Sequence, residues 1–406
     1  MRFADRISCA ATAAFTLAFI VIMTLTMARP AQAQTESVLY TFCSLTNCDD
    51  GFLPMSNVIM DAQGNMYGTT IDGGVHHSGT VFKLDSGGTL TVLYSFCSAR
   101  RMCTDGAHPF SGLVRDSAGS LYGTTADGGH YSAGTVFKLS SDGTLTTLHS
   151  FQNNGTDAYT PAAGLLMDSK GNLYGTSYYG GKYGLGTVYR VTPTGKESIM
   201  HSFGATSTDG ANPANVVPVM DRLGNLYGTT EFGGSVLHQG TVFEITAGGK
   251  ESVLYTFGAT ATDAEFPYAG LAIDAEGNFY GTTGGIGPGA VFRVTHSGTE
   301  TVIHSFQNSG TGGNSPYAPL VRDAAGNLYG VTFLGGLYGF GTVFKINASG
   351  VETILHAFAN DGTDGVGPYG GLLLDSAGNL YGTTEAGGNP GCTNLYGCGT
   401  VFKITP

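Results

Sequence analysis

The heptapeptide Gly64-Asn65-Met66-Tyr67-Gly68-Thr69-Thr70 recurs along the chain in close copies such as GSLYGTT, GNLYGTT and GNFYGTT. The copies begin at Gly119, Gly171, Gly224, Gly277, Gly326 and Gly378, so the seven units start 49 to 55 residues apart. Self-similarity at a nearly fixed interval is the sequence signature of a repeat architecture. We therefore interpret the chain after its first thirty-odd residues as seven copies of one structural unit.

Each unit contains four short apolar or alternating segments rich in β-branched and aromatic residues and bounded by Gly and Asp, which is the pattern of β-strands. We name these expected strands a to d and place them, in representative units, at 112–116 (a), 65–70 (b), 79–84 (c) and 91–96 (d). Four antiparallel strands every fifty-odd residues are typical of one propeller blade.

The expected turn between strands a and b has the pattern D-x-x-G-N, in which Asp accepts hydrogen bonds from the turn and Gly supplies a positive φ. The seven aspartates are Asp61, Asp116, Asp168, Asp221, Asp274, Asp323 and Asp375. A ring of carboxylates for cations is the alternative, but we favour one turn-capping Asp per hairpin. The Gly in the middle of strand b, as in Gly68, is expected to let a neighbouring aromatic ring or backbone pack closely.

The two ends of the chain predict how the repeats close. The last unit stops after its strand c, at 399–404, whereas the segment 38–42 reads VLYTF and is a strand d without a unit of its own. Pairing these segments would complete the seventh blade and leave no open sheet edge at the seam. The sequence predicts an all-β fold: a seven-bladed β-propeller over residues 34–406, a single domain whose N-terminal strand closes the last blade.

Residues 1–33 have the pattern of a secretory signal peptide. Arg2 and Arg6 precede an apolar run, and the small-residue sequence Ala31-Gln32-Ala33 follows it. The alternative is a retained membrane anchor, because the apolar run is long. We expect cleavage after Ala33, no membrane span in the mature chain, and a secreted or periplasmic location.

Export changes the interpretation of the cysteines. Apart from Cys9, six cysteines stand in three close pairs, Cys43/Cys48, Cys97/Cys103 and Cys392/Cys398. An even number of cysteines in an oxidising compartment predicts disulfides, and proximity favours these three local bridges among fifteen possible connectivities. A zinc site does not fit, because no C-x2-C pair is present and no His stands beside the cysteines at ligand spacing.

Composition excludes several classes of function. The formal net charge is −12 and only 12% of residues are charged, which leaves no basic footprint for nucleic acid. The chain has no G-x-S-x-G elbow, no H-E-x-x-H and no Walker loop, so no catalytic residue is assigned. No cofactor is expected.

The pattern GLVRD at Gly112–Asp116, followed by GSLYGTT and GTVFKL, resembles the GloVer tandem repeat of exported "choice-of-anchor" bacterial proteins. The resemblance covers essentially the whole mature chain in seven copies. It implies an exported repeat protein and brings no established activity and no catalytic residues. Unlike many members, this chain ends at its seventh strand c, where a C-terminal anchor would otherwise follow.

In a propeller, the b–c and d–a loops share one face, and here these loops vary in length and content. Binding residues concentrate on such loops, so this variable face is the expected binding site. Its candidate ligand-binding residues are His76, His77, His130, Tyr131, Tyr178, Tyr179, Tyr183, His238, Tyr338, Phe340 and Tyr396. Tyr suits recognition of sugar rings or peptides, although some of these side chains could simply cover Gly-rich loops. The pair His76-His77 lacks a third metal ligand, so no metal site is predicted.

The residue before the Asp of strand a is Arg in only two units, at Arg115 and Arg322. These cations could hold an anion in the central channel, but we favour a local pair of each with Asp at the channel mouth. The d–a loops repeat an Asp before Pro, as in Asp50 and Asp105, for which loop capping is a better explanation than calcium because no loop has the D-x-[DN]-x-[DN]-G pattern.

Two functions from different classes stay open. The first is a non-catalytic module that binds a glycan, a peptide or an envelope protein through the variable face. The second is a glycan- or lactone-active hydrolase or lyase that uses loop His and Asp on the same face. Fold alone does not decide between them, and neither the ligand nor the oligomeric state follows from the sequence.

Overall fold

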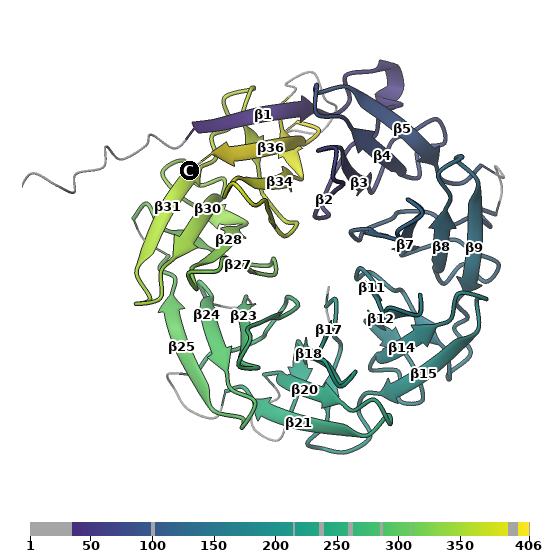
Figure 1. The fold of residues 1–406 in the computed structure, drawn as a ribbon, viewed down its shortest axis with the longest axis vertical. Coiled ribbons are helices and arrows are strands. Elements are labelled where there is room, and N and C mark those ends of the chain that lie inside the picture. Colours follow the sequence, from purple (N-terminus) through teal and green to yellow (C-terminus); the bar gives the residue numbers. More distant parts are fainter. Residues whose placement is uncertain are drawn as a thin grey trace, which may run out of the picture.

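The computed structural model describes residues 35–98, 102–213, 216–234, 239–258, 263–284, 287–308, 310–388 and 397–405. These residues form seven four-stranded antiparallel sheets around a centre, as Figure 1 shows. The predicted all-β seven-bladed β-propeller is confirmed. The predicted signal peptide, residues 1–33, lies outside the described residues.

The strands of each blade run from the centre of the ring outwards in chain order. Blade 1 contains β2 (Ile59–Met60), β3 (Met66–Thr70), β4 (Thr80–Leu84) and β5 (Leu90–Ser95). Blade 2 contains β6 (Val114–Arg115), β7 (Leu121–Thr125), β8 (Thr135–Leu139) and β9 (Leu145–Ser150). Blade 3 contains β11 (Leu166–Met167), β12 (Leu173–Ser177), β14 (Thr187–Val191) and β15 (Glu197–Ser202). Blade 4 contains β17 (Val219–Met220), β18 (Leu226–Thr230), β20 (Thr241–Ile245) and β21 (Glu251–Thr256).

The remaining blades follow the same order. Blade 5 contains β22 (Ala272–Ile273), β23 (Phe279–Thr283), β24 (Ala290–Val294) and β25 (Glu300–Ser305). Blade 6 contains β27 (Val321–Arg322), β28 (Leu328–Thr332), β30 (Thr342–Ile346) and β31 (Glu352–Ala357). Blade 7 contains β33 (Leu373–Leu374), β34 (Leu380–Thr384), β36 (Thr400–Thr405) and, as its outermost strand, β1 (Thr35–Thr41).

The seam of the ring closes as predicted. Strand β1 pairs antiparallel with β36, from Thr35 opposite Thr405 to Thr41 opposite Thr400, and in Figure 1 the two strands lie side by side. The expected strands b, c and d agree with the observed ones to within a few residues. Strand a is shorter than expected, with two residues in the ladder where five were predicted.

The core lies between neighbouring blades. The Phe that follows strand d of one blade contacts the aromatic residue of strand c in the next blade, and both rings are fully buried. For example, Phe96 of blade 1 contacts Phe137 of blade 2, with ring centroids 5.1 Å apart. At the seam, Phe42 contacts Phe82 in the same way, at 5.1 Å. Each boundary is therefore a dry aromatic contact that the repeat reproduces.

The mid-strand glycines explain how these rings fit. A Cβ on Gly68 would lie 2.7 Å from Cζ of Phe82 on the adjacent strand, which is closer than carbon atoms approach one another. The other six mid-strand glycines face the aromatic residue of their own strand c with the same clearance, between 2.5 and 2.8 Å. The predicted close packing against these glycines is observed.

Buried threonines link the blades in sequence. The first Thr after the mid-strand Gly donates a hydrogen bond of 2.7 to 3.1 Å to a backbone carbonyl of the next blade in six blades. The last of these bonds runs from Thr383 to the carbonyl of Ser56 and crosses the seam. Blade 6 has Val331 at this position and lacks the hydroxyl.

The turn aspartates cap the a–b hairpins as predicted. Asp61 accepts hydrogen bonds from the backbone N–H of Gln63 and Asn65, from the Asn65 side chain and from the Tyr67 hydroxyl. Burial opposes ionisation of Asp61, but these hydrogen bonds outweigh it and lower its pKa to about 2. The face of the ring that carries the a–b turns thus uses its aspartates to stabilise the hairpins.

Candidate functional site

The b–c and d–a loops are joined to one another on the variable face. Four two-stranded sheets make this connection: β10 (Ala158–Tyr159) with β13 (Tyr179–Gly180), β16 (Gly210–Ala211) with β19 (Phe232–Gly233), β26 (Gly313–Asn314) with β29 (Leu334–Gly335), and β32 (Gly365–Val366) with β35 (Ala386–Gly387). Isolated bridges do the same in other blades, as between Phe52 and Asp72. The loops are therefore fixed in position by backbone hydrogen bonds rather than by side chains alone.

Gly180 shows why the sequence of these loops is rich in glycine. Its φ is +94°, and a Cβ there would lie 2.5 Å from the carbonyl oxygen of Asp157 in the paired loop. Only Gly satisfies both conditions, because it adopts positive φ without cost and has no side chain to clash.

The predicted binding residues are spread around the variable face. Tyr131, Tyr179, Tyr183 and Tyr338 are between 43% and 55% exposed, whereas Tyr178 and Phe340 are half-buried. His77 and His130 are exposed, and His76 is half-buried. Among the described residues, two ring contacts join members of this set to each other: His130 with Tyr131, and Tyr178 with Tyr179. Both pairs are adjacent in the sequence. His238 and Tyr396 lie outside the described residues.

Sequence reasoning missed a group of aromatic residues at the centre of this face. We call it the aromatic mouth, and it consists of Phe110, Tyr268, Tyr317 and Tyr369. Each follows the proline that ends a d–a loop, a position that holds Met55 in blade 1 and Ala162 in blade 3. The sequence signal that could have found this group is an aromatic residue after the loop proline in four of the seven units and a non-aromatic residue in the other three.

The four side chains converge from blades that are not all neighbours. Tyr317 contacts Tyr268 and Tyr369, with ring centroids 5.2 and 5.9 Å apart, and Phe110 contacts Tyr369 at 6.0 Å. The Tyr369 hydroxyl donates a hydrogen bond of 3.3 Å to the Tyr268 hydroxyl. Phe110, Tyr317 and Tyr369 also line a cavity of about 60 Å³, whose other walls are the segments that lead into the innermost strands of six blades. The aromatic mouth therefore lies at the centre of the ring.

A larger pocket opens beside the aromatic mouth. We call it the aromatic pocket; its volume is about 210 Å³ and its walls include Phe110, Tyr178, Tyr179 and Tyr268. The remaining lining residues are Thr160, Ala162, Ala163, Thr176 and Pro213. In blade 3 the position after the loop proline holds the small Ala162, whereas four other blades have an aromatic residue there. The pocket lies at this position.

A carboxylate stands behind one wall of the aromatic pocket. Glu231 follows β18 directly and accepts a hydrogen bond of 3.2 Å from the Tyr178 hydroxyl. Burial raises the pKa of Glu231 above its ordinary value, although the bond from Tyr178 opposes this. Burial and the negative charge of Glu231 raise the pKa of Tyr178, and the same charge adds to the effect of burial on the pKa of Tyr268. Both hydroxyls therefore stay protonated at neutral pH.

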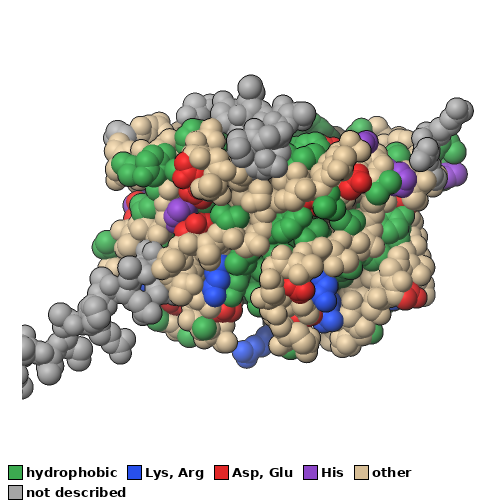
Figure 2. Space-filling view, turned by 90° about the horizontal axis from the view of Figure 1, so that it is seen from above, with side chains coloured by type: hydrophobic (Ala, Val, Ile, Leu, Met, Phe, Trp, Pro, Cys, Tyr) green, Lys and Arg blue, Asp and Glu red, His purple; other side chains and the backbone are tan. Residues whose placement is uncertain are grey.

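The two arginines predicted for the channel lie by the a–b turns, on the opposite face. The Arg115 guanidinium is 5.8 Å from the ring centroid of Tyr67, and Arg322 is 5.7 Å from that of Tyr280. Each contact crosses to the preceding blade. In the side view of Figure 2, Lys and Arg side chains gather towards one face of the ring and His side chains towards the other. Local pairing of each arginine with Asp, which we favour, and anion binding in the channel both stay predictions.

The outer strands carry three clusters of one His and two carboxylates at blade boundaries. They are His149 with Asp157 and Glu197, His201 with Asp209 and Glu251, and His356 with Asp364 and Glu36. In each cluster the possible ligand atoms lie within 4.8 Å of one another. Tyr40 and Tyr94 replace the His in other blades and donate to Asp50 and Asp105 at 2.7 and 2.8 Å. Because Tyr substitutes for His as the donor, we interpret these clusters as caps of the d–a loops.

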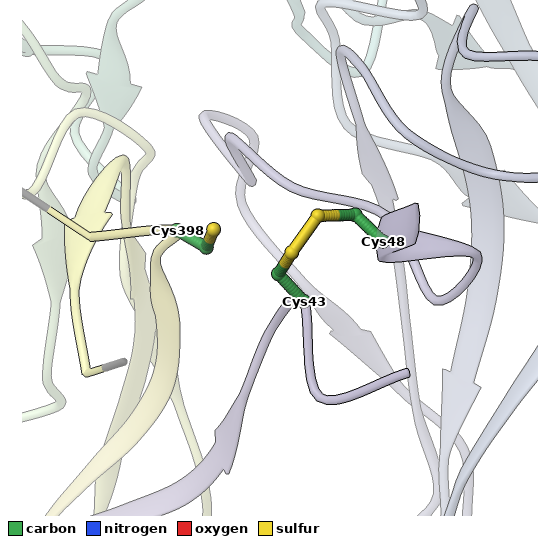
Figure 3. A group of neighbouring side chains, drawn as sticks. All are labelled: Cys43, Cys48 and Cys398. Atoms are coloured by element: carbon green, nitrogen blue, oxygen red, sulfur yellow. A yellow bond between two sulfur atoms is a disulfide. The ribbon is translucent and has the colours of Figure 1, made fainter. Parts of the chain in front are cut away.

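Two of the three predicted disulfides are confirmed, Cys43–Cys48 and Cys97–Cys103. The first encloses the 3-10 turn η1 (Thr46–Cys48). Cys392 of the third predicted pair lies outside the described residues. In Figure 3 the buried Cys398 points towards the Cys43–Cys48 disulfide, and the three sulfur atoms lie within 4.8 Å of one another. The cysteines therefore meet where β1 and β36 close the ring.

Comparison with known proteins assigns the family. The family model described as the Gloeobacter/Verrucomicrobia repeat matches residues 24–167, 54–287 and 284–406, which together span nearly all of the chain. The chain belongs to the Gloeobacter/Verrucomicrobia repeat family. This is the GloVer repeat that the heptapeptide and its flanking motifs resemble, so that prediction is confirmed.

Two solved structures illustrate what this GloVer protein is similar to. The extracellular domain of a protein described as a one-component system from B. thetaiotaomicron has a TM-score of 0.54 at 11% identity. The match covers 91% of this chain and 40% of that one, so the GloVer protein spans about two fifths of its length. The calcium-binding protein regucalcin from Agrobacterium tumefaciens has a TM-score of 0.44 at 14% identity, covering 91% and 93% of the two chains. No curated protein matches the sequence.

The GloVer repeat accounts for the scaffold and leaves the centre of the variable face unexplained. The turn aspartates, mid-strand glycines and linking threonines all have folding roles, and they recur from blade to blade. The aromatic mouth and the walls of the aromatic pocket do not recur in this way. The described part of this GloVer protein contains no helix with the length and apolar character needed to cross a membrane.

Proposed function

We propose that this protein is an exported, non-catalytic module that binds a glycan through the aromatic mouth and the adjoining aromatic pocket. The observation that carries the proposal is the convergence of Phe110, Tyr268, Tyr317 and Tyr369 at positions where the repeat itself does not require an aromatic side chain. Aromatic rings provide large, rigid surfaces on which the apolar faces of sugars stack. A peptide or an envelope protein is the other ligand class that this surface suits.

Export supports a ligand outside the cytoplasm. Residues 1–33 have the pattern of a cleavable signal peptide, and disulfides such as Cys97–Cys103 persist in oxidising compartments. We propose that the mature protein is secreted or periplasmic.

A glycan array probed with the mature, oxidised protein tests the binding function. We expect binding of a subset of glycans, loss of that binding in Tyr178→Ala and Tyr268→Ala, and normal binding in the control Tyr338→Ala, which changes an exposed tyrosine of another blade. Failure of the array to detect a ligand, or binding that survives both pocket substitutions, would contradict the proposal.

A second candidate is the hydrolase or lyase, and one observation favours it. His108 lies between two carboxylates of the variable face, with Nδ1 3.0 Å from Asp127 and Nε2 3.6 Å from Asp72. A histidine held by a carboxylate can act as a general acid or base. His108 does not belong to the lining of the aromatic pocket. Product analysis of every glycan that binds, repeated with His108→Ala, distinguishes the two functions: turnover that this substitution abolishes would favour the enzyme.

A further inference from the structure

The walls of the aromatic pocket combine four rings with small side chains. Phe110, Tyr178, Tyr179 and Tyr268 contribute the rings, and Tyr178 and Tyr179 lie edge to face with centroids 4.7 Å apart. No Lys, Arg or His side chain belongs to the described lining. Aromatic walls alone would suit many apolar groups, so the ligand class must follow from the charges around them.

Two of the three tyrosine hydroxyls of the pocket have hydrogen-bond partners that do not belong to its lining. The Tyr178 hydroxyl donates to Glu231, and the Tyr268 hydroxyl accepts from Tyr369 in the aromatic mouth. What these residues offer to the pocket is therefore mainly their rings. The face of an aromatic ring is electron-rich and attracts cations.

Glu231 strengthens this preference in two ways. A phenol that donates to a carboxylate gains electron density on its ring, which increases the attraction of Tyr178 for a cation. The carboxylate itself is half-buried behind the wall, where its field is screened less than at an exposed site. Among the described residues, the side chain that hydrogen-bonds to Glu231 is the neutral Tyr178 hydroxyl. An ionised Glu231 therefore gives the pocket a negative potential, although the surface of the pocket is largely apolar.

We propose that the aromatic pocket binds an organic cation, a protonated or quaternary ammonium group carried by the ligand. This inference rests on the proposed binding function and names the chemistry of the group that enters the pocket. An anion is excluded by the ring faces and by Glu231. A neutral group of the same shape gains the apolar contact but leaves the carboxylate without a counter-charge.

Two small probes of nearly equal shape isolate the charge: choline and its neutral isostere 3,3-dimethyl-1-butanol. Isothermal titration of the mature, oxidised protein with each is expected to give about tenfold tighter binding of choline, in line with a cation–π contribution in a partly desolvated site. Equal affinities for the two probes, or binding of neither, would overturn the inference.

Variants locate the effect. Glu231→Gln removes the charge and is expected to weaken choline binding several-fold while leaving the neutral isostere unchanged. Tyr268→Leu keeps an apolar wall and is expected to weaken choline more than the isostere. Leu337→Ala, which changes an exposed apolar side chain of another blade, is the control and is expected to change neither affinity. An unchanged choline affinity in folded Glu231→Gln, checked by circular dichroism, would contradict the role of the carboxylate.

Oligosaccharides separate this inference from the proposed glycan function. Glucosamine oligomers carry protonated amines, and N-acetylglucosamine oligomers of the same length are neutral. Preference for the glucosamine oligomers supports both proposals, whereas equal binding of the two series keeps the glycan function and overturns the cation. Choline binding without binding of any glycan supports the cation and overturns the glycan function.

Discussion

Gly68 and Phe82 show at the residue scale how little space the repeat leaves between adjacent strands. The Phe82 ring is fully buried, and its Cζ lies 2.7 Å from the position that a Cβ on Gly68 would take. Protein interiors are close-packed, so an added methyl group here must displace the ring or the backbone. The glycine is thus required by a steric contact and not by a turn.

Gly68→Ala is expected to lower the free energy of unfolding by about 1 to 3 kcal/mol, the usual cost of overpacking a core. Urea denaturation followed by circular dichroism measures the change. The control Gly248→Ala lies in an exposed turn, where the nearest atom to the new Cβ is 3.8 Å away, and is expected to have little effect. Equal stabilities of the two variants would contradict the packing argument.

A second residue-scale prediction concerns Glu197 at the boundary of blades 2 and 3. Burial and the nearby Asp157 raise the pKa of Glu197 to about 7, although His149 opposes this shift. The folded protein therefore binds more protons than the unfolded chain between the ordinary pKa of 4.5 and pH 7. The stability that this proton provides is fully present below pH 4.5 and is lost as the pH rises through 7.

Glu197→Gln removes this titration. Its Tm relative to the parent protein is expected to be higher at pH 8 than at pH 5, because the parent must bury a charge at pH 8 and the amide is neutral. Thermal melts between pH 5 and 8 measure the difference, with the exposed Glu276→Gln as the control. A Tm difference that does not depend on pH would show that Glu197 keeps an ordinary pKa.

At the scale of strands and loops, the sequence predicts what repeats. Strands b, c and d follow from alternating apolar residues and Gly boundaries, and β3, β4 and β5 begin and end within a residue of the expected positions. Strand a forms only two ladder pairs in each blade, as between β6 and β7, although β7 continues past these pairs to Thr125. Periodicity does not report where a ladder stops.

The aromatic mouth and pocket could not be predicted in the same way. Phe110 and Tyr369 are 259 positions apart in the chain and meet only because seven blades close around a narrow centre. Tyr178 was named as a candidate for its residue type, but its partner Glu231 lies in the next blade. Contacts of this kind depend on the radius of the ring and on the side chains of several blades together.

The local disulfide at the blade 2 loop is expected to stabilise the fold. Cys97 and Cys103 are six positions apart, and closing so short a loop in the unfolded chain contributes about 2 kcal/mol in the chain-entropy treatment. The double substitution Cys97→Ser with Cys103→Ser should therefore lower the free energy of unfolding by about that amount in non-reducing denaturant. The experiment fails to support a stabilising bridge if the variant and the parent unfold at the same urea concentration.

At the scale of the whole molecule, the ring depends on a strand from the other end of the chain. β1 completes blade 7, and Phe42, which follows it, packs in the core cluster shared by blades 7 and 1. Removing residues 35–41 would leave β36 as an unpaired edge beside a buried surface, the kind of edge that promotes association.

The deletion is therefore expected to lower Tm and to cause concentration-dependent association in size-exclusion chromatography. Addition in trans of a peptide with the sequence of residues 35–42 should restore the elution volume of the parent protein and part of the lost Tm, because an extended peptide can add to an open sheet edge. A peptide of the same composition in scrambled order is the control. Unchanged elution and Tm after the deletion would mean that blade 7 is stable with three strands.

Ala162 has a consequence for how such a protein changes its binding properties. The pocket is lined by Ala162, and Ala162 and Ala214 are the two small side chains among the seven equivalent positions that follow the loop prolines. Exchanging Ala162 with Tyr317 would close the present pocket and open another three blades away, towards a different set of loops. A closed ring of equivalent units can thus relocate its specificity by two substitutions, so the fold and the ligand are free to evolve separately.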